Sequence, residues 1–357
     1  MKTLSQLTLL CLAVVLIASL IYYLEPDSSP PPQITSAPSP SPIGPDLRGI
    51  TAWINSDPLT LQQLKGKVVL IDFWTYTCIN CIRTLPYLTS WDEKYRDKGL
   101  VIIGVHSPEF DFEKELGNVK AAVEKYNIQY PVALDNEYAT WQAFDNHYWP
   151  HKFLFNKDGE MVYDHIGEGA YEETEAKIQD LLQELGQAVD MPLTPETPRP
   201  SLYQTPELYA GYAFTAGRIP LGNPEGQIPE TVQAYTLPPS LIPDRIYLTG
   251  RWESTRDTLR HADTEPTSIV LRFTAKTVNI VLAPQGDSQL EILLDGQPLT
   301  PEQAGNDVIV TPERSSLTVR EPRLYNLLGE SNTYGTHTLQ LITAEDTFAF
   351  SAFTFGQ

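Results

Sequence analysis

The sequence predicts an α/β domain followed by an all-β sandwich, with a membrane anchor at the N-terminus. Residues 50–188 alternate between short apolar runs and amphipathic stretches, which predicts a sheet covered by helices on both faces. From about residue 207 the pattern changes to short strands separated by Gly, Pro, Asn and Asp, which predicts an antiparallel sandwich. The uncharged apolar run at residues 7–24 is long enough for a thin bilayer core and predicts the anchor.

Two proline-rich stretches divide the chain. We expect an anchor at 1–25, a Pro/Ser-rich linker at 26–48, the α/β domain at 49–189, a second linker at 190–206 and the β-domain at 207–357. The linkers contain too little apolar surface to fold and should be extended tethers. One positive side chain precedes the apolar run, so the folded part is expected outside the cytoplasm, in a bacterial periplasm or an equivalent compartment. A cleaved signal peptide is the alternative to an anchor.

Composition excludes several classes of protein. The chain has 25 Lys and Arg against 45 Asp and Glu, a net charge of −20, so it lacks the basic excess of a nucleic-acid binder. Its cysteines are Cys11, Cys78 and Cys81, which excludes a disulfide-stapled scaffold and a four-cysteine zinc site. Pro150 separates His147 from His151 and forbids the helical spacing that a metal site would need. We therefore expect neither a metal nor another cofactor.

The predicted elements follow in a regular order. In the α/β domain, VVLIDFW (68–74) and LVIIGVH (100–106) are unbroken apolar runs, as expected for central strands buried on both faces. The remaining elements are helical stretches at 79–98, 111–127 and 171–187 and strands at 130–135, 152–155 and 160–166. The predicted strands of the β-domain lie at 246–250, 268–275, 277–284, 289–296, 307–311, 316–321, 337–344 and 347–356.

The motif Cys78-Ile79-Asn80-Cys81 carries the chemistry, because it follows the first buried strand and opens a helix. A thiol at a helix N-terminus faces unpaired N–H groups and the positive end of the helix dipole, which favour its thiolate. The second thiol, one turn later, can bond to that thiolate and then attack a mixed disulfide. We expect Cys78 to be the attacking sulfur and Cys81 the buried resolving sulfur. A purely structural disulfide would close too short a loop to stabilise the fold much.

Two more residues near the motif stand out. Asp72 lies among apolar residues of the strand, where a carboxyl is costly unless its protonation is used. The alternative is a strand-end residue paired with a lysine such as Lys67. Pro86, five residues after Cys81, would kink the helix that the motif opens.

Residues 59–187 resemble the thioredoxin superfamily, specifically its extracytoplasmic TlpA/ResA-like branch. The resemblance rests on LTLQQLKGKVVLIDFWTYTCINCIRTLPYL and on the spacing of Asp72, Cys78, Cys81 and Pro86. WTYTCINCIRTLPYL, VHSPEF, YWPHKFLFNKDGEMVYDHIGEGAYEETE and TPELYAGY are most similar to the soluble portion of DipZ-type proteins. A looser similarity continues into the β-domain through LYNLLGES, GTHTLQLI and AFTFG.

The resemblance implies a role for each matching residue. Cys78 matches the nucleophile and Cys81 the resolving cysteine of the superfamily. Asp72 matches the buried acid that exchanges protons with the resolving thiol. Pro150 matches the cis-proline beside the two sulfurs, although most X–Pro bonds are trans.

The resemblance also implies supporting residues. Trp74 matches the tryptophan that packs under the active site, and Trp149 directly precedes the expected cis-proline. Glu168, in Ile166-Gly167-Glu168-Gly169, is typical of these relatives and is either a second acid near the sulfurs or a surface carboxylate.

The sequence departs from the superfamily pattern at the motif. Thioredoxin's Gly-Pro between the cysteines is Ile79-Asn80 here, and Thr77 replaces a tryptophan, so the direction of electron flow stays open. DipZ-type proteins carry a multi-span membrane domain that delivers electrons, whereas this chain shows a single anchor. We therefore expect a separate membrane electron donor of the CcdA/DsbD type.

In DipZ-type relatives the C-terminal domain resembles a carbohydrate-binding-module jelly roll. Sugar binding needs an exposed aromatic platform, for which Trp252 and Tyr325 are the candidates. A carbohydrate ligand is one expectation for this domain. Client docking and a spacer role are the alternatives.

The function predicted from these observations is protein thiol–disulfide exchange by a membrane-tethered extracytoplasmic oxidoreductase acting as a reductase on protein clients. One alternative is a thiol peroxidase of the same fold, because Thr75-x-x-Cys78 resembles the peroxiredoxin motif, although Ile71 stands where that motif has a proline. The other alternative is a glycan- or protein-binding module whose redox domain is vestigial.

Overall fold

The computed structural model describes residues 45–197, 202–215, 218, 221–262, 265–286, 288–343 and 348–357. The predicted anchor at 1–25, with Cys11, and most of the linker at 26–48 lie outside this part of the chain. No helix among the described residues has both the length and the apolar character needed to cross a bilayer. The α/β domain and the β-domain belong to one compact unit, Ile43–Gln357.

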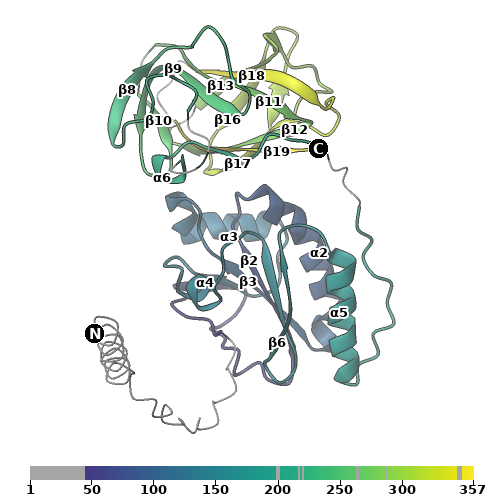
Figure 1. The fold of residues 1–357 in the computed structure, drawn as a ribbon. Helices are drawn as coiled ribbons and strands as arrows, with labels where there is room; N and C mark the ends of the chain where they lie inside the picture. Colours follow the sequence, from purple (N-terminus) through teal and green to yellow (C-terminus); the bar gives the residue numbers. More distant parts are fainter. Residues whose placement is uncertain are drawn as a thin grey trace, which may run out of the picture. The chain divides into compact units, whose positions relative to one another are not determined.

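The α/β domain alternates strands and helices, as the sequence predicts (Figure 1). Its strands are β1 (Ala52–Ile54), β2 (Val68–Trp74), β3 (Leu100–His106), β4 (Val132–Leu134), β5 (His151–Phe155) and β6 (Met161–Ile166). Its helices are α2 (Ile79–Tyr95), α3 (Leu116–Lys125), α4 (Ala139–Ala143) and α5 (Tyr171–Glu184), with 3₁₀ turns η1 (Arg96–Lys98) and η2 (Asp111–Lys114).

The six strands form a mixed sheet in the order β1-β4-β3-β2-β5-β6. β2 and β3 are parallel, as are β3 and β4, whereas β5 runs antiparallel to β2 and β6 antiparallel to β5. The carboxyl ends of β2 and β3 therefore meet at one edge of the sheet, the position where α/β sheets usually place their functional side chains. The cysteine motif follows β2 at this edge.

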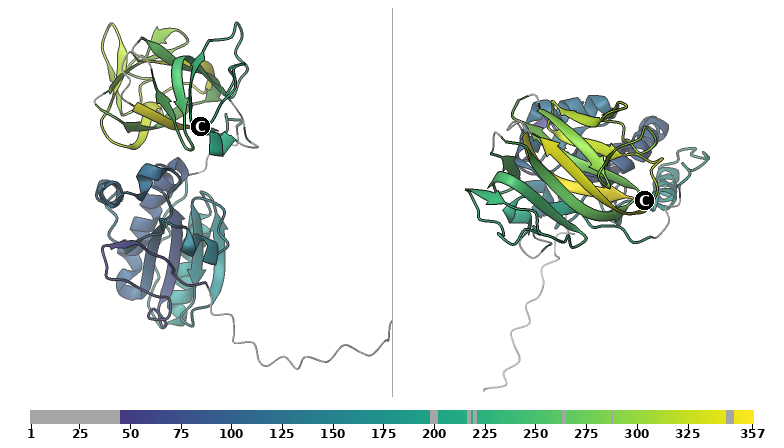
Figure 2. Two further views of the ribbon diagram at one scale, coloured as in Figure 1. Left: turned by 90° about the vertical axis from the view of Figure 1, so that its left-hand side faces the viewer. Right: turned by 90° about the horizontal axis from the view of Figure 1, so that it is seen from above.

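Alternation along β2 sends its side chains to two cores. Leu70 and Trp74 pack with apolar residues of α2, α3 and α5, whereas Ile71 and Phe73 pack on the opposite face with Phe144, which follows α4. Helices thus cover both faces of the sheet (Figure 2). Asp72 shares the face of Leu70 and Trp74, and this is the face on which α2 carries the second cysteine.

The helix predicted at 111–127 is two elements, η2 and α3. The side chain of Glu113 turns inward and accepts the backbone N–H of Phe110 at 2.9 Å, which closes the 3₁₀ turn before α3 begins. Asn118 fixes the junction by donating to the carbonyl of Phe112 at 2.8 Å.

The β-domain contains one short helix, α6 (Tyr212–Thr215), among its described residues, and its strands are antiparallel, as predicted. They are β7 (Leu208–Tyr209), β8 (Thr231–Tyr235), β9 (Arg245–Ser254), β10 (Leu259–His261), β11 (Thr267–Ala275), β12 (Thr277–Pro284), β13 (Ser288–Leu294), β14 (Gln297–Pro298), β15 (Val308–Val310), β16 (Ser315–Val319), β17 (Arg323–Leu328), β18 (Gly335–Thr343) and β19 (Phe348–Gly356).

These strands form one continuous, nearly closed sheet instead of two separate sheets. The cause is β9, whose first half pairs with β11 and whose second half pairs with β8 and β10. Gly250, between the two halves, has a φ of 79°, which a residue without a side chain adopts readily. The strand can therefore pass from one layer of the domain to the other.

Candidate functional site

The two thiols of the motif lie in the first turn of α2. Cys78 is the N-cap residue, and its Sγ accepts the backbone N–H of Cys81 at 3.2 Å. Cys78 is half-buried, whereas Cys81 is 1% exposed, and both thiols are free. A half-buried sulfur can meet a client, whereas a buried sulfur one turn away can react only with the first.

The electrostatics of Cys78 differ from the expectation. Burial is the largest influence and raises the pKa of the Cys78 thiol, and the carboxyls of Glu207 and Glu109 raise it further. Hydrogen bonds from Cys81 lower it but do not outweigh burial. The helix N-terminus alone therefore does not make this thiol acidic while the pocket is covered. Burial also raises the pKa of Cys81, well above the usual value.

Asp72 is buried in the middle of the sheet at 1% exposure, and its Oδ1 has no hydrogen-bond partner. Burial raises the pKa of this carboxyl to about 7, although the charge of Lys152 opposes the shift. The carboxyl also contributes to the raised pKa of Cys81, so the two groups lie close enough to influence each other's ionisation. A group that titrates near neutral pH beside a buried thiol can give and take its proton.

The lysine next to Asp72 is Lys152, which the sequence analysis does not identify. The two residues are directly opposite each other on β2 and β5, and Lys152 is fully buried with its Nζ donating to the carbonyl of Gly167 at 3.1 Å. Burial lowers the pKa of Lys152, and the charge of Asp72 opposes this. The alternative pairing of a strand-end Asp72 with Lys67 is wrong, because Asp72 is buried and Lys67 is exposed at the start of β2.

Trp74 is fully buried and packs in the same core as Cys81, as the resemblance implies. Its indole lies over Gly104 of β3. A Cβ atom at Gly104 would lie 2.9 Å from Trp74 Nε1 and 3.2 Å from Tyr130 Cε2, so the ring needs a glycine on the neighbouring strand. The close approach fixes the indole beneath the active site.

We expect Gly104→Ala to destabilise the fold by about 1–3 kcal/mol, because the added methyl must push aside a fully buried indole. Urea unfolding followed by circular dichroism would measure the change. Gly117→Ala, on α3, is the matched control, since the added Cβ would have no atom within 4 Å beyond its chain neighbours and the helix's own backbone, and alanine favours a helix. Equal stability of the Gly104 variant and the wild type would contradict the packing argument.

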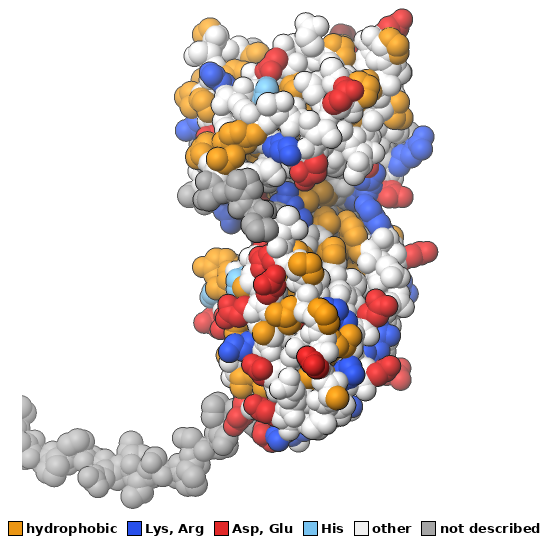
Figure 3. All heavy atoms as spheres, turned by 90° about the vertical axis from the view of Figure 1, so that its right-hand side faces the viewer, with side chains coloured by type: hydrophobic (Ala, Val, Ile, Leu, Met, Phe, Trp, Pro, Cys, Tyr) orange, Lys and Arg blue, Asp and Glu red, His pale blue; other side chains and the backbone are white. Residues whose placement is uncertain are grey.

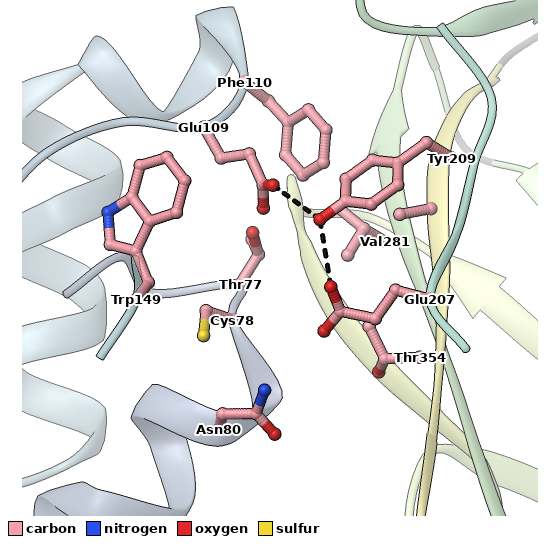
Figure 4. Close-up of a pocket in the computed structure, with 11 residues that line it drawn as sticks. Thr77, Cys78, Asn80, Glu109, Phe110, Trp149, Glu207, Tyr209, Val281 and Thr354 are labelled. Carbon is pink, nitrogen blue, oxygen red and sulfur yellow. Dashed lines mark hydrogen bonds between the residues drawn. The ribbon is translucent and has the colours of Figure 1, made fainter. Parts of the chain in front are cut away.

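A cavity of about 50 Å³ lies in front of Cys78 (Figure 4). Thr77 and Trp149 line it from the α/β domain, and Glu207 and Tyr209 line it from the β-domain. The Trp149–Pro150 peptide is cis, so the expected cis-proline directly follows a residue of the cavity wall. The first thiol thus lies between the two domains and not on an open surface.

The other two supporting residues lie on the surface beside the motif. Pro86 lies inside α2 with its ring exposed. Glu168 follows β6 and forms an ion pair with Arg83 of α2 at 3.3 Å. The carboxyls that raise the Cys78 pKa are Glu207 and Glu109, which line the cavity together with Cys78, whereas Glu168 does not line it.

Two acidic residues of the cavity wall, Glu109 and Glu207, were not predicted from the sequence. Glu109 follows β3, at the same sheet edge as Cys78, so the rule that parallel strands meet at their carboxyl ends could have identified it. Glu207 comes from the β-domain. No local pattern marks it, because its proximity depends on how two distant segments fold together.

The aromatic pair predicted for sugar binding is not available. Trp252 is 0% exposed, with its Nε1 donating to the carbonyl of Thr249 at 2.9 Å. Tyr325 is 1% exposed, and its hydroxyl donates to the carbonyl of Glu321 at 2.7 Å. Both rings belong to the core of the β-domain, so the expectation of an exposed platform at these residues is wrong.

Two further predicted features can be compared with the structure. Thr75 is fully buried, and its Oγ1 lies 3.3 Å from Nε2 of His106. His147 and His151 have separate partners, Asp145 and Asp164. Over the part of the chain that is described, no group of three or more His, Cys, Asp or Glu side chains could hold a metal ion.

Two family models match this chain. The model described as "Redoxin" matches residues 41–182, and the model described as "Thioredoxin like C-terminal domain" matches residues 205–356. The first covers the cysteine motif and the sheet that carries it, and the second covers almost the whole β-domain.

Curated relatives give the same assignment. Protein DipZ of Mycobacterium tuberculosis is 40% identical over 265 residues, which are 72% of this chain but 37% of DipZ. Thiol-disulfide oxidoreductase YkuV of Bacillus subtilis is 30% identical over 39% of this chain and 94% of YkuV. Thiol-disulfide oxidoreductase ResA of Bacillus cereus is 32% identical over 34% of this chain and 68% of ResA. With its free thiol pair at the start of α2, the chain belongs to the redoxin family of thioredoxin-like thiol–disulfide oxidoreductases.

Proposed function

We propose that this oxidoreductase is tethered to a membrane by residues 1–25, acts outside the cytoplasm and reduces disulfides in client proteins. The observation that carries the proposal is the asymmetry of the thiol pair. Cys78 is half-buried at the start of α2, and Cys81 is 1% exposed behind it with its N–H on the Cys78 sulfur. One thiol is placed to meet a client and the other to release it.

The reaction proceeds in two exchanges. The Cys78 thiolate attacks a client disulfide, a Cys78–client disulfide forms, and the other client sulfur leaves with the electron pair and takes up a proton. Cys81 then gives its proton to Asp72 and attacks the Cys78 sulfur. This releases the second client sulfur, which is protonated in turn, and leaves a Cys78–Cys81 disulfide. The client gains two electrons and two protons, and the enzyme loses them.

The same proposal assigns partners. A separate membrane protein of the CcdA/DsbD type would return two electrons to the Cys78–Cys81 disulfide. We assign client docking to the β-domain, because a groove of about 630 Å³ lies between its strands and the Ile79, Ile82 and Arg83 side chains of α2. On another face, shown in Figure 3, a second groove of about 810 Å³ lies beside Arg83 and Tyr87. A carbohydrate ligand and a jelly-roll relationship stay predictions, now without Trp252 and Tyr325.

A redox titration of the full chain against glutathione tests the direction of electron flow. If the protein is a reductase, the Cys78/Cys81 couple should have a potential of about −270 mV, on the scale of known superfamily members. A potential of about −120 mV would instead indicate that the protein oxidises its clients. Rapid peroxide consumption with little disulfide exchange would overturn the proposal in favour of a thiol peroxidase. Membrane fractionation of the full chain and of a variant lacking residues 1–25 would test the tether, which predicts release of the truncated protein.

A further inference from the structure

A carboxyl–hydroxyl cluster of Glu109, Tyr209 and Glu207 lies beside Cys78 (Figure 4). The Tyr209 hydroxyl is 2.7 Å from Glu109 Oε1 and 3.0 Å from Glu207 Oε2. A hydroxyl has one proton to donate, whereas ionised carboxylates only accept. Two full hydrogen bonds therefore require a second proton, held by one of the two carboxyls, which then donates to the tyrosine oxygen.

Glu109 is the carboxyl that fits this requirement. Its surroundings raise its pKa to about 8, through burial first and then the like charges of Glu207 and Glu113. The Tyr209 hydroxyl and the Arg218 guanidinium oppose the shift. Glu109 thus carries a proton at neutral pH while the cluster is intact. The cavity that it shares with Cys78, about 50 Å³, has room for one or two water molecules.

Glu113 holds Glu109 in place beside the motif. Its buried carboxylate accepts the hydroxyl and the backbone N–H of Thr77 at 2.6 and 3.3 Å through Oε1. Through Oε2 it accepts the backbone N–H of Glu109 at 2.5 Å. One side chain thus ties the residue before Cys78 to Glu109. Because these residues belong to the α/β domain, Glu109 keeps its place when a client displaces Tyr209.

We propose that Glu109 exchanges a proton with the outer sulfurs of the reaction, and that Tyr209 of the β-domain occupies this carboxyl until a client replaces it. The inference rests on the proposed function, since it takes Cys78 as the attacking thiol. When the β-domain residues Tyr209 and Glu207 are displaced, Glu109 loses the burial and the like charge of Glu207 that keep it protonated, and it becomes a base. It then accepts the Cys78 proton as the new S–S bond forms and returns it to the client thiolate that leaves as the old bond breaks. Asp72 serves the inner thiol in the same way.

The test compares alkylation of Cys78 with turnover in the same variants. At pH 9, where Glu109 is ionised, Glu109→Gln removes a negative charge that raises the Cys78 pKa. Iodoacetamide should therefore alkylate Cys78 severalfold faster at this pH, in a background where Cys11 and Cys81 are serines. Insulin reduction by the variant with all cysteines present should fall at least about tenfold, because proton return is lost. Glu115→Gln, an exposed carboxylate without a side-chain cap bond, should change neither rate.

Faster alkylation together with slower turnover is the expected result. Because damage to the fold would also expose Cys78 and slow turnover, the variant must keep the wild-type unfolding midpoint in urea. Unchanged turnover in Glu109→Gln, or a fall in both rates, would overturn the role of Glu109. Tyr209→Phe keeps the ring and removes the hydroxyl, so alkylation should rise severalfold; an unchanged rate would overturn the role of Tyr209. If the wild type shows no exchange that depends on Cys78, the proposed function fails, while the alkylation rates still report on the cluster.

Discussion

Cys78→Ser should lower the rate of disulfide exchange by about a thousandfold or more, because a serine hydroxyl does not ionise near neutral pH. Cys78 is the only one of the two motif thiols with exposed surface, since Cys81 is 1% exposed behind it. Insulin reduction under fixed concentrations of a chemical reductant would measure the loss. Cys11→Ser, in the predicted anchor, is the control that should keep full activity.

Cys81→Ser should behave differently from Cys78→Ser. The first exchange remains intact, so the client should stay bound to Cys78 as a mixed disulfide that survives non-reducing electrophoresis. The opposite pattern, with the mixed disulfide accumulating in Cys78→Ser, would show that the two thiols have exchanged roles. It would also require Cys81 to become accessible, against the burial described above.

Asp72→Asn should stabilise the reduced protein by about 2–4 kcal/mol above pH 8, since the folded-state pKa of about 7 lies some three units above the usual 3.8. Between pH 4 and pH 7 the unfolded state has already lost this proton while the folded state retains it, so wild-type stability falls as the pH rises. Above pH 7 the cost of the buried charge is fully present. Asparagine cannot attract the charge of Lys152, and this loss offsets part of the gain in stability. The expected gain is therefore smaller than the whole pKa shift of Asp72 would give.

Urea unfolding at pH 4.5 and pH 8.5 would measure this dependence. The stability difference between variant and wild type should be small at the lower pH and large at the higher one. Asp158→Asn, an exposed turn residue, is the matched control and should show no such dependence. A difference independent of pH would mean that the Asp72 carboxyl does not titrate in this range.

The same substitution should slow the second exchange. Without the carboxyl, Cys81 loses the acidic group that accepts its proton, and burial already raises its pKa. Mixed disulfides should therefore persist longer in Asp72→Asn than in the wild type, most clearly above pH 7, where the wild-type carboxyl is ionised and can accept the proton. Equal lifetimes would place the proton acceptor elsewhere.

The central strands could be predicted from the sequence residue for residue, but other elements could not. The ranges 68–74 and 100–106 coincide with β2 and β3, because strands buried on both faces appear as unbroken apolar runs. β17 has no such signal, since Arg323 and Asn326 interrupt its apolar residues. The predicted helix at 111–127 is interrupted because Glu113 bonds to a distant residue, Thr77, which no helical period reveals.

The residues of the site also divide into those that the sequence could predict and those that it could not. Cys78, Cys81 and Asp72 belong to one strand–turn–helix segment, so their spacing alone suggested that they act together. Lys152 can be identified only from the register of β2 and β5. Tyr209 meets Glu109 across 100 residues of sequence, in a contact that depends on the packing of one domain against the other.

The passage of β9 through both layers has a consequence for access to Cys78. The first half of β9 is hydrogen-bonded into one layer and the second half into the other, so the two layers are joined by a continuous strand and should move together. Tyr209 is fastened to this sheet through the pairing of β7 with β19. Moving Tyr209 away from Glu109 therefore requires the sheet of the β-domain to move as one body, and we expect this opening to be a slow, collective step instead of a side-chain flip.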